Sequence, residues 1–343
     1  MSKAVSKRIT LKDVAQQAGY SVNTVSRALR SMPDISVETR LKIQGTAHTM
    51  GYINNTIASS LRLGYTNTIA VIIPDVSNLF FTLMTEDIER TARDHGYSSI
   101  LLNTFEDEDM ELIALQTALN KNVDGILWSP TQANTDNLRF LKASGVPFVL
   151  LARNYREEST DFVVGDDFMG GYQATKHLIN NGHKNIVIIT PPIYNPSARD
   201  RREGYVKALK EAELPVQEDL ICEAPIRGEF FRAQFGNILH KREDVTAVFA
   251  FNDMVAWSVF DYLLRRGYNV PEDISIVGFD HLQSRLKIPF QLTSVDNDKS
   301  RISNTAINML LRRMQGNVSS EYYMQEIVPT WLFEGDTVSN RNE

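Results

Sequence analysis

The chain has 343 residues, 43% of them hydrophobic, and a formal net charge of −6, which suits a protein of a small head and a larger body of two lobes. No stretch approaches the roughly 18 uninterrupted apolar residues of a membrane span, and the amino terminus lacks the apolar segment of a signal peptide. We therefore expect a cytoplasmic protein without a membrane partner. The single Cys222 excludes an internal disulfide, and the six scattered histidines give no zinc spacing, so no metal or cofactor is expected. We expect Cys222 to be a small residue in a strand.

Charge is divided unevenly along the chain. Residues 1–64 contain nine Lys or Arg and three Asp or Glu, a net charge of +6, whereas the rest of the chain has a net charge of −12. This balance is expected when only one end of a protein meets the phosphates of a nucleic acid.

The basic segment has the pattern of two short helices joined by a tight turn. The first is predicted over residues 11–18, with Thr10 as N-cap and Gly19 ending it. Ser21 can cap a second helix over 22–29, whose apolar residues form one inward stripe. Its outward side carries side chains that can hydrogen-bond base edges or phosphates in a major groove, namely Asn23, Thr24 and Arg27.

A third amphipathic helix is predicted from the cap Ser36 to Met50, closed by Gly51. Its apolar positions are Val37, Leu41, Ile43, Ala47 and Met50. Three such helices can bury a small core, so residues 1–53 are predicted to form an all-α helix-turn-helix headpiece.

Residues 54–64 connect this headpiece to the body. Two turns of helix are possible over 56–62, but a helix this short does not persist alone in water. We expect it to fold only against a partner. On DNA, two copies in a minor groove could push Leu61 between base steps and kink the duplex. The alternative is a linker helix whose leucine packs on the body.

Beyond Gly64, short apolar runs alternate with amphipathic helices, a pattern typical of parallel sheets built from βαβ units. We expect a core over 65–343 with two parallel-sheet lobes and a hinge between them. The first is predicted over about 67–164 and 298–325, and the second over about 167–296 and 326–337. The predicted strands are 69–73, 99–102, 125–128, 147–151, 161–164, 185–189, 247–251 and 274–278, and the helices include 81–95, 108–121, 253–266 and 299–315.

Polar residues directly follow these runs, where ligands bind to open parallel sheets. They are Asp75, Asn103, Ser129, Arg153, Asp166, Asn252, Asp253, Asp280, Asn297 and Asp298. Carboxylate and amide oxygens that accept from hydroxyl groups, with an arginine that donates, would suit a sugar or polyol. The alternative is that Asp and Asn simply end strands in turns.

Several segments closely resemble the lac and gal repressor family of transcriptional regulators. They are Thr10-Leu-Lys-Asp-Val-Ala, Tyr20-Ser-Val-Asn-Thr-Val-Ser-Arg27, Gly51-Tyr-Ile-Asn-Asn55 and Ala58-Ser-Ser-Leu61, and the likeness continues through almost the whole chain. The resemblance implies a sequence-specific DNA-binding repressor with a periplasmic-binding-protein-like core. It implies that Val22 and Asn23 vary base preference, that Arg27 is a further contact, and that Leu61 with Ala58 forms the minor-groove wedge. The full set of candidate DNA-binding residues is Thr10, Ser21, Val22, Asn23, Thr24, Arg27, Asn54, Ala58 and Leu61.

The same resemblance implies an effector site between the lobes. Arg201, in the segment 197–205, looks like the family's donor clamp on the effector, and Asn252 and Asp280 look like hydroxyl partners. Phe80 would lie against a sugar ring, and Asn297 would add a polar contact. The implied effector is a small molecule, a sugar or a sugar derivative.

The chain departs from the family pattern at two places. Many members have an acidic residue where this chain has Ala152 followed by Arg153, which leaves a phosphorylated or acidic ligand open. The tail lacks the arginine usual near 332–336 and has no leucine heptad, so we expect a homodimer and not a tetramer.

An enzyme is the contrasting hypothesis. The sequence has no phosphate-binding Gly-rich loop, no Gly-x-Ser-x-Gly elbow and no His-Glu-x-x-His motif. Asp166 and Asp167 would point to opposite sides of a strand end, which argues against a paired acid and base. We therefore expect a non-enzymatic dimer on a near-palindromic operator, in which effector-driven lobe closure controls the pairing of the hinge helices. A protein co-repressor in place of a small effector, or a sugar-active enzyme, remain the alternatives.

Overall fold

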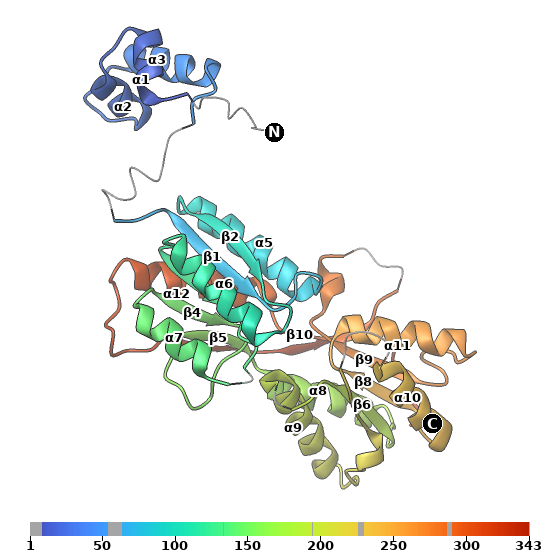
Figure 1. The fold of residues 1–343 in the computed structure, drawn as a ribbon. Helices are drawn as coiled ribbons and strands as arrows, with labels where there is room; N and C mark the ends of the chain where they lie inside the picture. The colour runs from blue at the N-terminus through green and yellow to red at the C-terminus, as the bar shows by residue number, and fades with distance from the viewer. Residues whose placement is uncertain are drawn as a thin grey trace, which may run out of the picture. The chain divides into compact units, whose positions relative to one another are not determined.

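The computed structural model describes residues 9–53, 64–132, 134–193, 195–225, 230–286 and 290–342. The chain forms two compact units, residues 1–66 and 67–343, each of which is described by itself (Figure 1). The predicted hinge segment, with Asn54, Ala58 and Leu61, lies outside the described residues except for Gly64.

The first unit contains helices α1 (Leu11–Ala18), α2 (Val22–Leu29) and α3 (Val37–Thr49). Each helix starts at a hydroxyl residue whose side chain accepts a hydrogen bond from the first turn: Thr10, Ser21 and Ser36. The three helices bury one small apolar core, made by Val14, Ala15, Ala18, Val25, Ala28, Ile43 and Ala47.

Two apolar positions of the third helix were predicted wrongly as core. Val37 and Leu41 are 67% and 64% exposed, whereas Ile43 and Ala47 are buried. Residue 41 lies two positions before residue 43, about 200° around the helix, so both cannot face the same core. Only the row through 43 and 47 contacts α1 and α2.

The first lobe of the core is an entirely parallel six-stranded sheet, in the order β11-β5-β4-β3-β1-β2. Helices α5 and α12 pack on one face, and helices α6 and α7 pack on the other. The elements of this lobe are β1 (Thr68–Ile73), α5 (Leu79–Asp94), β2 (Ser98–Asn103), α6 (Glu108–Asn120), β3 (Gly125–Trp128), α7 (Asp136–Ser144), β4 (Phe148–Leu151), β5 (Phe162–Gly165), α12 (Lys299–Met314) and β11 (Gln325–Val328).

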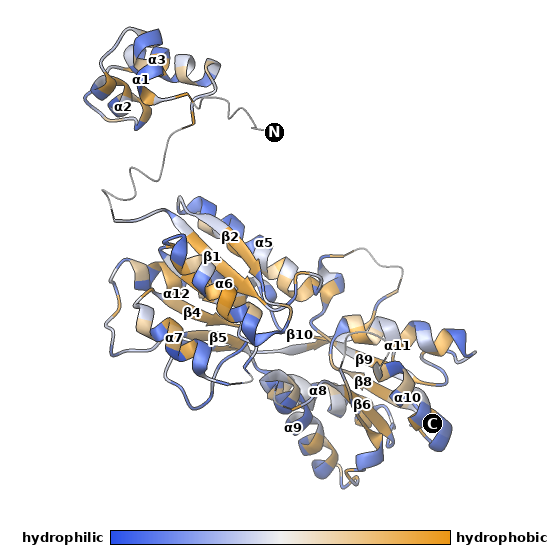
Figure 2. Ribbon diagram, viewed as in Figure 1, coloured by the Kyte–Doolittle hydropathy of each residue, from blue (hydrophilic) through white to orange (hydrophobic). Residues whose placement is uncertain are grey.

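The second lobe has the same architecture, with strand order β12-β10-β9-β8-β6-β7. Helices α10 and α11 cover one face and α8 and α9 the other, so the apolar strands lie between polar helix surfaces (Figure 2). The elements are α8 (Asp167–Asn180), β6 (Ile186–Thr190), α9 (Pro196–Glu211), β7 (Ile221–Glu223), α10 (Phe230–Lys241), β8 (Ala247–Ala250), α11 (Asp253–Arg265), β9 (Ser275–Phe279), β10 (Thr293–Asp296) and β12 (Trp331–Phe333), with short 3-10 turns at Glu218–Leu220 and Leu282–Ser284.

All eight predicted strands form, each within one residue of its expected ends. Cys222 lies buried in β7, as predicted, and burial raises the pKa of its thiol to about 12. Strands β7, β10, β11 and β12 were not among the predicted runs, because β7 and β12 have only three residues and β10 and β11 contain polar residues.

The chain crosses between the lobes three times: between β5 and α8, between β10 and α12, and between β11 and β12. Residues 326–328, expected in the second lobe, pair instead with β5 of the first sheet as part of β11. The third crossing therefore comes after this strand. Strand β12 then pairs antiparallel with β10, which gives an otherwise parallel second sheet one reversed edge.

None of the helices in the described ranges combines the length and the apolar character that crossing a membrane requires.

Candidate functional site

In the headpiece, the start of α2 presents two exposed side chains beside the cap Ser21 and its partner Thr24. Val22 is 44% exposed and Asn23 is exposed, as expected for positions that face a partner. The Ser21 hydroxyl accepts from the Thr24 backbone N–H and lies 2.8 Å from the Thr24 hydroxyl. Thr10 forms a reciprocal capping box with Asp13. Thr10, Ser21 and Thr24 thus stabilise the two helices of the motif.

Arg27 is held by an acidic residue that sequence reasoning missed. Its Nη2 lies 2.5 Å from Asp34 Oδ2, and this pairing lowers the pKa of the Asp34 carboxyl. The loop that carries Asp34 is fixed from α3, because Arg40 donates to the carbonyl oxygens of Met32 and Ile35. The loop between α2 and α3 therefore sets the orientation of the Arg27 guanidinium.

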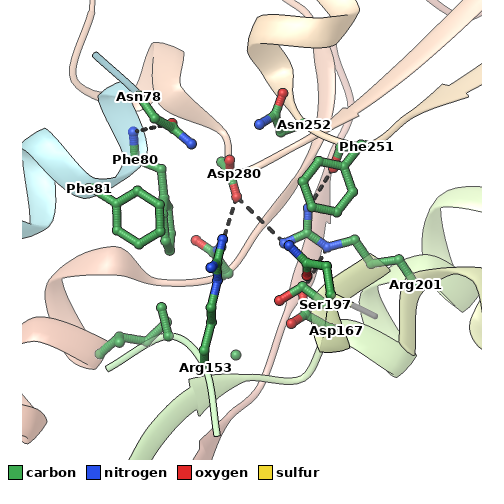
Figure 3. Close-up of a pocket in the computed structure, with 15 residues that line it drawn as sticks. Asn78, Phe80, Phe81, Arg153, Asp167, Ser197, Arg201, Phe251, Asn252 and Asp280 are labelled. Carbon is green, nitrogen blue, oxygen red and sulfur yellow. Dashed lines mark hydrogen bonds and ion pairs between the residues drawn. The ribbon is translucent and has the colours of Figure 1, made fainter. Parts of the chain in front are cut away.

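In the core, one pocket lies between the lobes, at the carboxyl ends of both sheets (Figure 3). It encloses about 490 Å³ of space not filled by protein, including its open mouth. All five predicted effector residues line it. The lining is Asn78, Phe80, Phe81, Ala152, Arg153, Gly165, Asp167, Asn195, Ser197, Arg201, Phe251, Asn252, Asp280, Asn297 and Ile302.

Arg201 projects from α9 and is fixed on several sides. Its Nε donates to Asp167 Oδ1 at 2.8 Å, and its Nη1 donates to the Phe251 carbonyl oxygen. The guanidinium carbon stands 3.5 Å from the ring centre of Phe279 and 4.5 Å from that of Phe251. Few rotamers remain to be lost when a ligand binds, so Arg201 is preorganised as a donor.

Asp280 follows β9 in a turn with left-handed backbone, φ 95°. Its Oδ1 accepts from Asn297 Nδ2 at 3.1 Å and lies 3.9 Å from Arg201 Nη2. Burial raises the pKa of Asp280 to about 6, although the charges of Arg201 and Lys299 oppose this shift. At neutral pH the side chain is therefore a buried, mostly ionised acceptor.

The two asparagines have different tasks. The Asn252 Oδ1 caps α11 by accepting from the Val255 backbone N–H, which holds the side chain at the pocket wall. Asn297 donates to Asp280, while its buried Oδ1 has no hydrogen-bond partner in the described part of the chain. An unpartnered buried acceptor costs free energy, so a ligand that donates to it would be favoured.

The first lobe supplies aromatic and cationic groups. Phe80 and Phe81 pack edge to face, 5.1 Å between ring centres, at the start of α5, which Asn78 caps. Arg153, which follows β4, forms two hydrogen bonds with the Glu106 carboxylate and one with the Pro130 carbonyl oxygen. Its charge is already balanced within the protein.

The polar residues that follow the strands divide into pocket residues and turn formers. Arg153, Asn252, Asp280 and Asn297 line the pocket. Three act locally: Asp75 accepts from Ser77, and Asp166 and Asp298 cap helices. Asn103 accepts from the Val76 backbone N–H, 27 positions away in the chain. Asp253 lies buried below the pocket and accepts from Leu282 and Ser294. The turn-forming explanation is thus correct for Asp75, Asp166 and Asp298.

Asp166 and Asp167 do not form a carboxylate pair. Asp166 caps α8, whereas Asp167 pairs with Arg201. The sequence prediction missed several site residues, among them Asp167, Phe81 and Phe251 of the pocket lining and Glu106, the partner of Arg153. The first three adjoin residues that were singled out, but no local pattern marks Glu106.

The family relationship follows from comparisons with known proteins. A family model for bacterial regulatory proteins of the lacI family matches residues 10–55, and one for periplasmic binding proteins and the sugar-binding domain of the LacI family matches residues 66–341. The HTH-type transcriptional repressor PurR of Actinobacillus pleuropneumoniae is 31% identical over 89% of this chain and 91% of its own length. Catabolite control protein A of Priestia megaterium is 34% identical over 89% of this chain and 92% of its own length.

Solved structures agree with this relationship. A LacI family transcriptional regulator from Enterococcus faecium with bound ribose is 28% identical, with a TM-score of 0.71 over 80% of this chain and 99% of its own. A lac repressor dimer bound to operator and an anti-inducer shares the fold, with a TM-score of 0.82 at 23% identity over 97% of this chain and all of its own. The chain belongs to the LacI family of bacterial DNA-binding transcriptional regulators.

Proposed function

We propose that the protein is a repressor whose affinity for its operator is controlled by a small polyhydroxylated effector, a sugar or sugar derivative, bound in the pocket between the lobes. The observation that carries this proposal is the unpartnered Oδ1 of Asn297, which lies beside the ionised Asp280 and the fixed Arg201. Two acceptors and a donor at one pocket wall match the two-way hydrogen bonding of a hydroxyl group.

Two further features support a sugar. Phe80 and Phe81 offer apolar surface for the C–H face of a sugar ring, beside the polar wall. In addition, solved relatives hold such ligands: the Enterococcus faecium regulator holds ribose, and the regulator CelR, 25% identical with a TM-score of 0.71, is a cellobiose complex.

For DNA, we propose that α2 enters the major groove, where Val22 and Asn23 contact base edges and Arg27 makes a downstream contact. Thr10 and Ser21, which cap their helices, would contact the phosphates together with Thr24, whose hydroxyl bonds to that of Ser21. Asn54, Ala58 and Leu61 would act in the central minor groove as paired hinge helices. This arrangement requires a near-palindromic operator, a homodimer and action in the cytoplasm. The edge strand β2 exposes Leu101, which offers apolar area for pairing of two copies.

The effector would control DNA binding through the relative position of the two lobes. Because the pocket is lined by both lobes, a ligand that contacts Phe80 and Asp280 together stabilises one relative position of the lobes. That position decides whether the hinge segments of two protomers can pair, so effector and operator affect each other's affinity by the same factor.

Two variants that separate effector binding from DNA binding test the proposal. An operator is selected by the full-length protein from a randomised DNA pool, and neutral monosaccharides and disaccharides, ribose and cellobiose included, are screened by thermal shift. Arg201→Ala should lose the effector response and keep operator affinity. Leu61→Ala should keep the effector-induced shift in melting temperature, while its operator affinity and DNA bending fall.

Three results would contradict it. A normal effector response in Arg201→Ala would show that Arg201 does not hold the effector. Unchanged DNA bending in Leu61→Ala would show that Leu61 does not insert between base steps. If no neutral sugar shifts the melting temperature of the wild-type protein, the proposed effector class is wrong.

A further inference from the structure

The wall of the pocket contains an ion pair that joins two loops of the first lobe. Arg153 Nη1 and Nη2 donate to Oε2 and Oε1 of Glu106, at 2.9 and 2.7 Å, which is a bidentate arrangement. Arg153 is 8% exposed and lines the pocket, while Glu106 is 38% exposed and meets the Arg153 guanidinium from the loop between β2 and α6. The two residues are 47 positions apart in the chain.

Both partners are held in place by their backbones. Phe105 and Glu106 have φ of 58° and 59°, and Ala152, directly before Arg153, has φ of 60°. Side-chain-bearing residues rarely adopt this left-handed region, and they keep it only where surrounding contacts enforce it, often at ligand sites. Here the Glu106 backbone N–H donates to the Pro74 carbonyl oxygen, and the Ala152 N–H donates to Val163. The pairing is therefore built into the loops.

The ion pair decides the charge that a ligand meets. Within the pocket and its immediate support, the cations Arg153, Arg201 and Lys299 face the anions Glu106, Asp167, Asp280 and Asp296. The described site thus has one negative charge in excess. An anionic ligand would add charge of the same sign in a largely buried site, where such repulsion is poorly screened. A neutral ligand meets no such cost.

We propose that Glu106 is a specificity-determining residue: by occupying the Arg153 guanidinium, it closes an anion-binding position and restricts the pocket to uncharged polyhydroxylated ligands. This inference rests on the proposed function, because it concerns the ligand class of the same pocket. The Arg153 guanidinium is then not available to a phosphorylated or acidic ligand, a class of ligand that the sequence alone left open.

The test removes the charge of Glu106 and keeps its shape. Full-length wild type, Glu106→Gln and the double variant Glu106→Gln with Arg153→Met are melted in sodium phosphate and in sodium chloride of equal ionic strength. Ribose and ribose 5-phosphate serve as a matched neutral and anionic pair. The double variant is the control for anions that bind elsewhere, including the basic headpiece.

We expect Glu106→Gln to gain affinity for phosphate or ribose 5-phosphate by about tenfold or more, the scale of one charge-assisted interaction. Phosphate stabilises proteins generally by exclusion from their surface, so the melting temperature should differ between the two salts in every variant. This difference should be the same in wild type and in the double variant, and larger in Glu106→Gln. The inference is overturned if Glu106→Gln gains no anion affinity, or if wild type already binds ribose 5-phosphate more tightly than ribose.

A second variant covers the case in which Glu106→Gln does not fold. Arg153→Gln is screened with the same neutral and anionic sugars, and it should show the same lack of response to an anionic sugar as wild type, because Glu106 already occupies the guanidinium. If the wild-type protein responds to an anionic sugar and Arg153→Gln abolishes that response, Arg153 binds the ligand and the inference is wrong. The proposed function fails by a separate result, the absence of any sugar response in wild type.

Discussion

At the scale of single residues, the pocket depends on the protonation of Asp280. Its buried carboxylate accepts from Asn297 and faces Arg201, and its pKa is raised to about 6 by burial. Only the ionised form is a pure acceptor for the hydroxyl groups of a ligand. Protonation near pH 6 would therefore change the chemistry of the site.

We predict that effector affinity falls about tenfold between pH 7 and pH 5, because the ionised fraction of a group with this pKa falls by that factor. Titration calorimetry at several pH values with the sugar found in the screen measures it. Asp280→Asn should bind more weakly and lose this pH dependence. An equal pH dependence in that variant would assign the effect to another group.

Stability should change in the opposite direction. The folded-state pKa of Asp280 lies above its ordinary value of 3.8, so the folded protein binds the proton more tightly than the unfolded chain. The contribution of this group is most favourable below pH 4 and declines as the pH rises through 6. Asp253, whose pKa burial raises to about 8, adds a contribution of the same sign.

At the scale of elements, α8 and α9 lie unusually close because glycines face each other. A Cβ at Gly171 would stand 2.3 Å from the Arg201 carbonyl oxygen. A Cβ at Gly204 would stand 2.2 Å from the Phe168 carbonyl oxygen. Such distances do not occur between real atoms, so any side chain here must move a helix. This contact places the backbone of Arg201 at the pocket.

We predict that Gly171→Ala destabilises the core by about 1–3 kcal/mol, the usual cost of overpacking, and lowers effector affinity by displacing Arg201. Urea denaturation and calorimetry measure the two effects. Gly45→Ala, in α3, is the control: a Cβ there meets open space, so helix propensity should stabilise the headpiece by up to about 1 kcal/mol. Unchanged stability in Gly171→Ala would show that the helices separate at no cost.

At the scale of the whole core, the segment after Asp280 joins the two lobes. Leu282 packs into the apolar core of the first lobe, although the strand that precedes it, β9, belongs to the second sheet. Arg285 then forms two hydrogen bonds, at 2.9 and 2.7 Å, with the buried Asp87 of α5, which also accepts from Ser300. A pocket residue is thereby connected to the helix that carries Phe80 and Phe81.

We predict that Arg285→Met destabilises the core by about 3 kcal/mol or more, because it leaves Asp87 buried without its cation. The double variant with Asp87→Leu should recover much of this loss, since neither charge is then buried alone. Denaturant titrations of wild type, both single variants and the double variant give the coupling energy. If the two single changes in the free energy of unfolding simply add, the coupling energy is zero and the ion pair does not connect the lobes.

Local features of the headpiece and of most strands could be predicted from the sequence. Caps at Thr10, Ser21 and Ser36 act over three residues, and the apolar runs are long enough to show a strand by themselves. Asn252, Asp280 and Asn297 followed from their place after the strands, and Phe80 and Arg201 followed from the family resemblance. Their roles stay a proposal, as do those of the candidates in the headpiece and hinge.

Other features depend on contacts between distant parts of the chain. Val37 and Leu41 face solvent because only one row of α3 contacts its neighbours, and residues 326–328 pair with the first sheet because the last crossing comes after them. Glu106 meets Arg153 across 47 positions, and Arg285 meets Asp87 across 198. The sequence by itself determined the helices, most strands and the family, because short-range hydrogen bonds and hydrophobic periodicity are local. Only the tertiary structure decided which charges are paired, because pairing depends on how the loops and lobes come together.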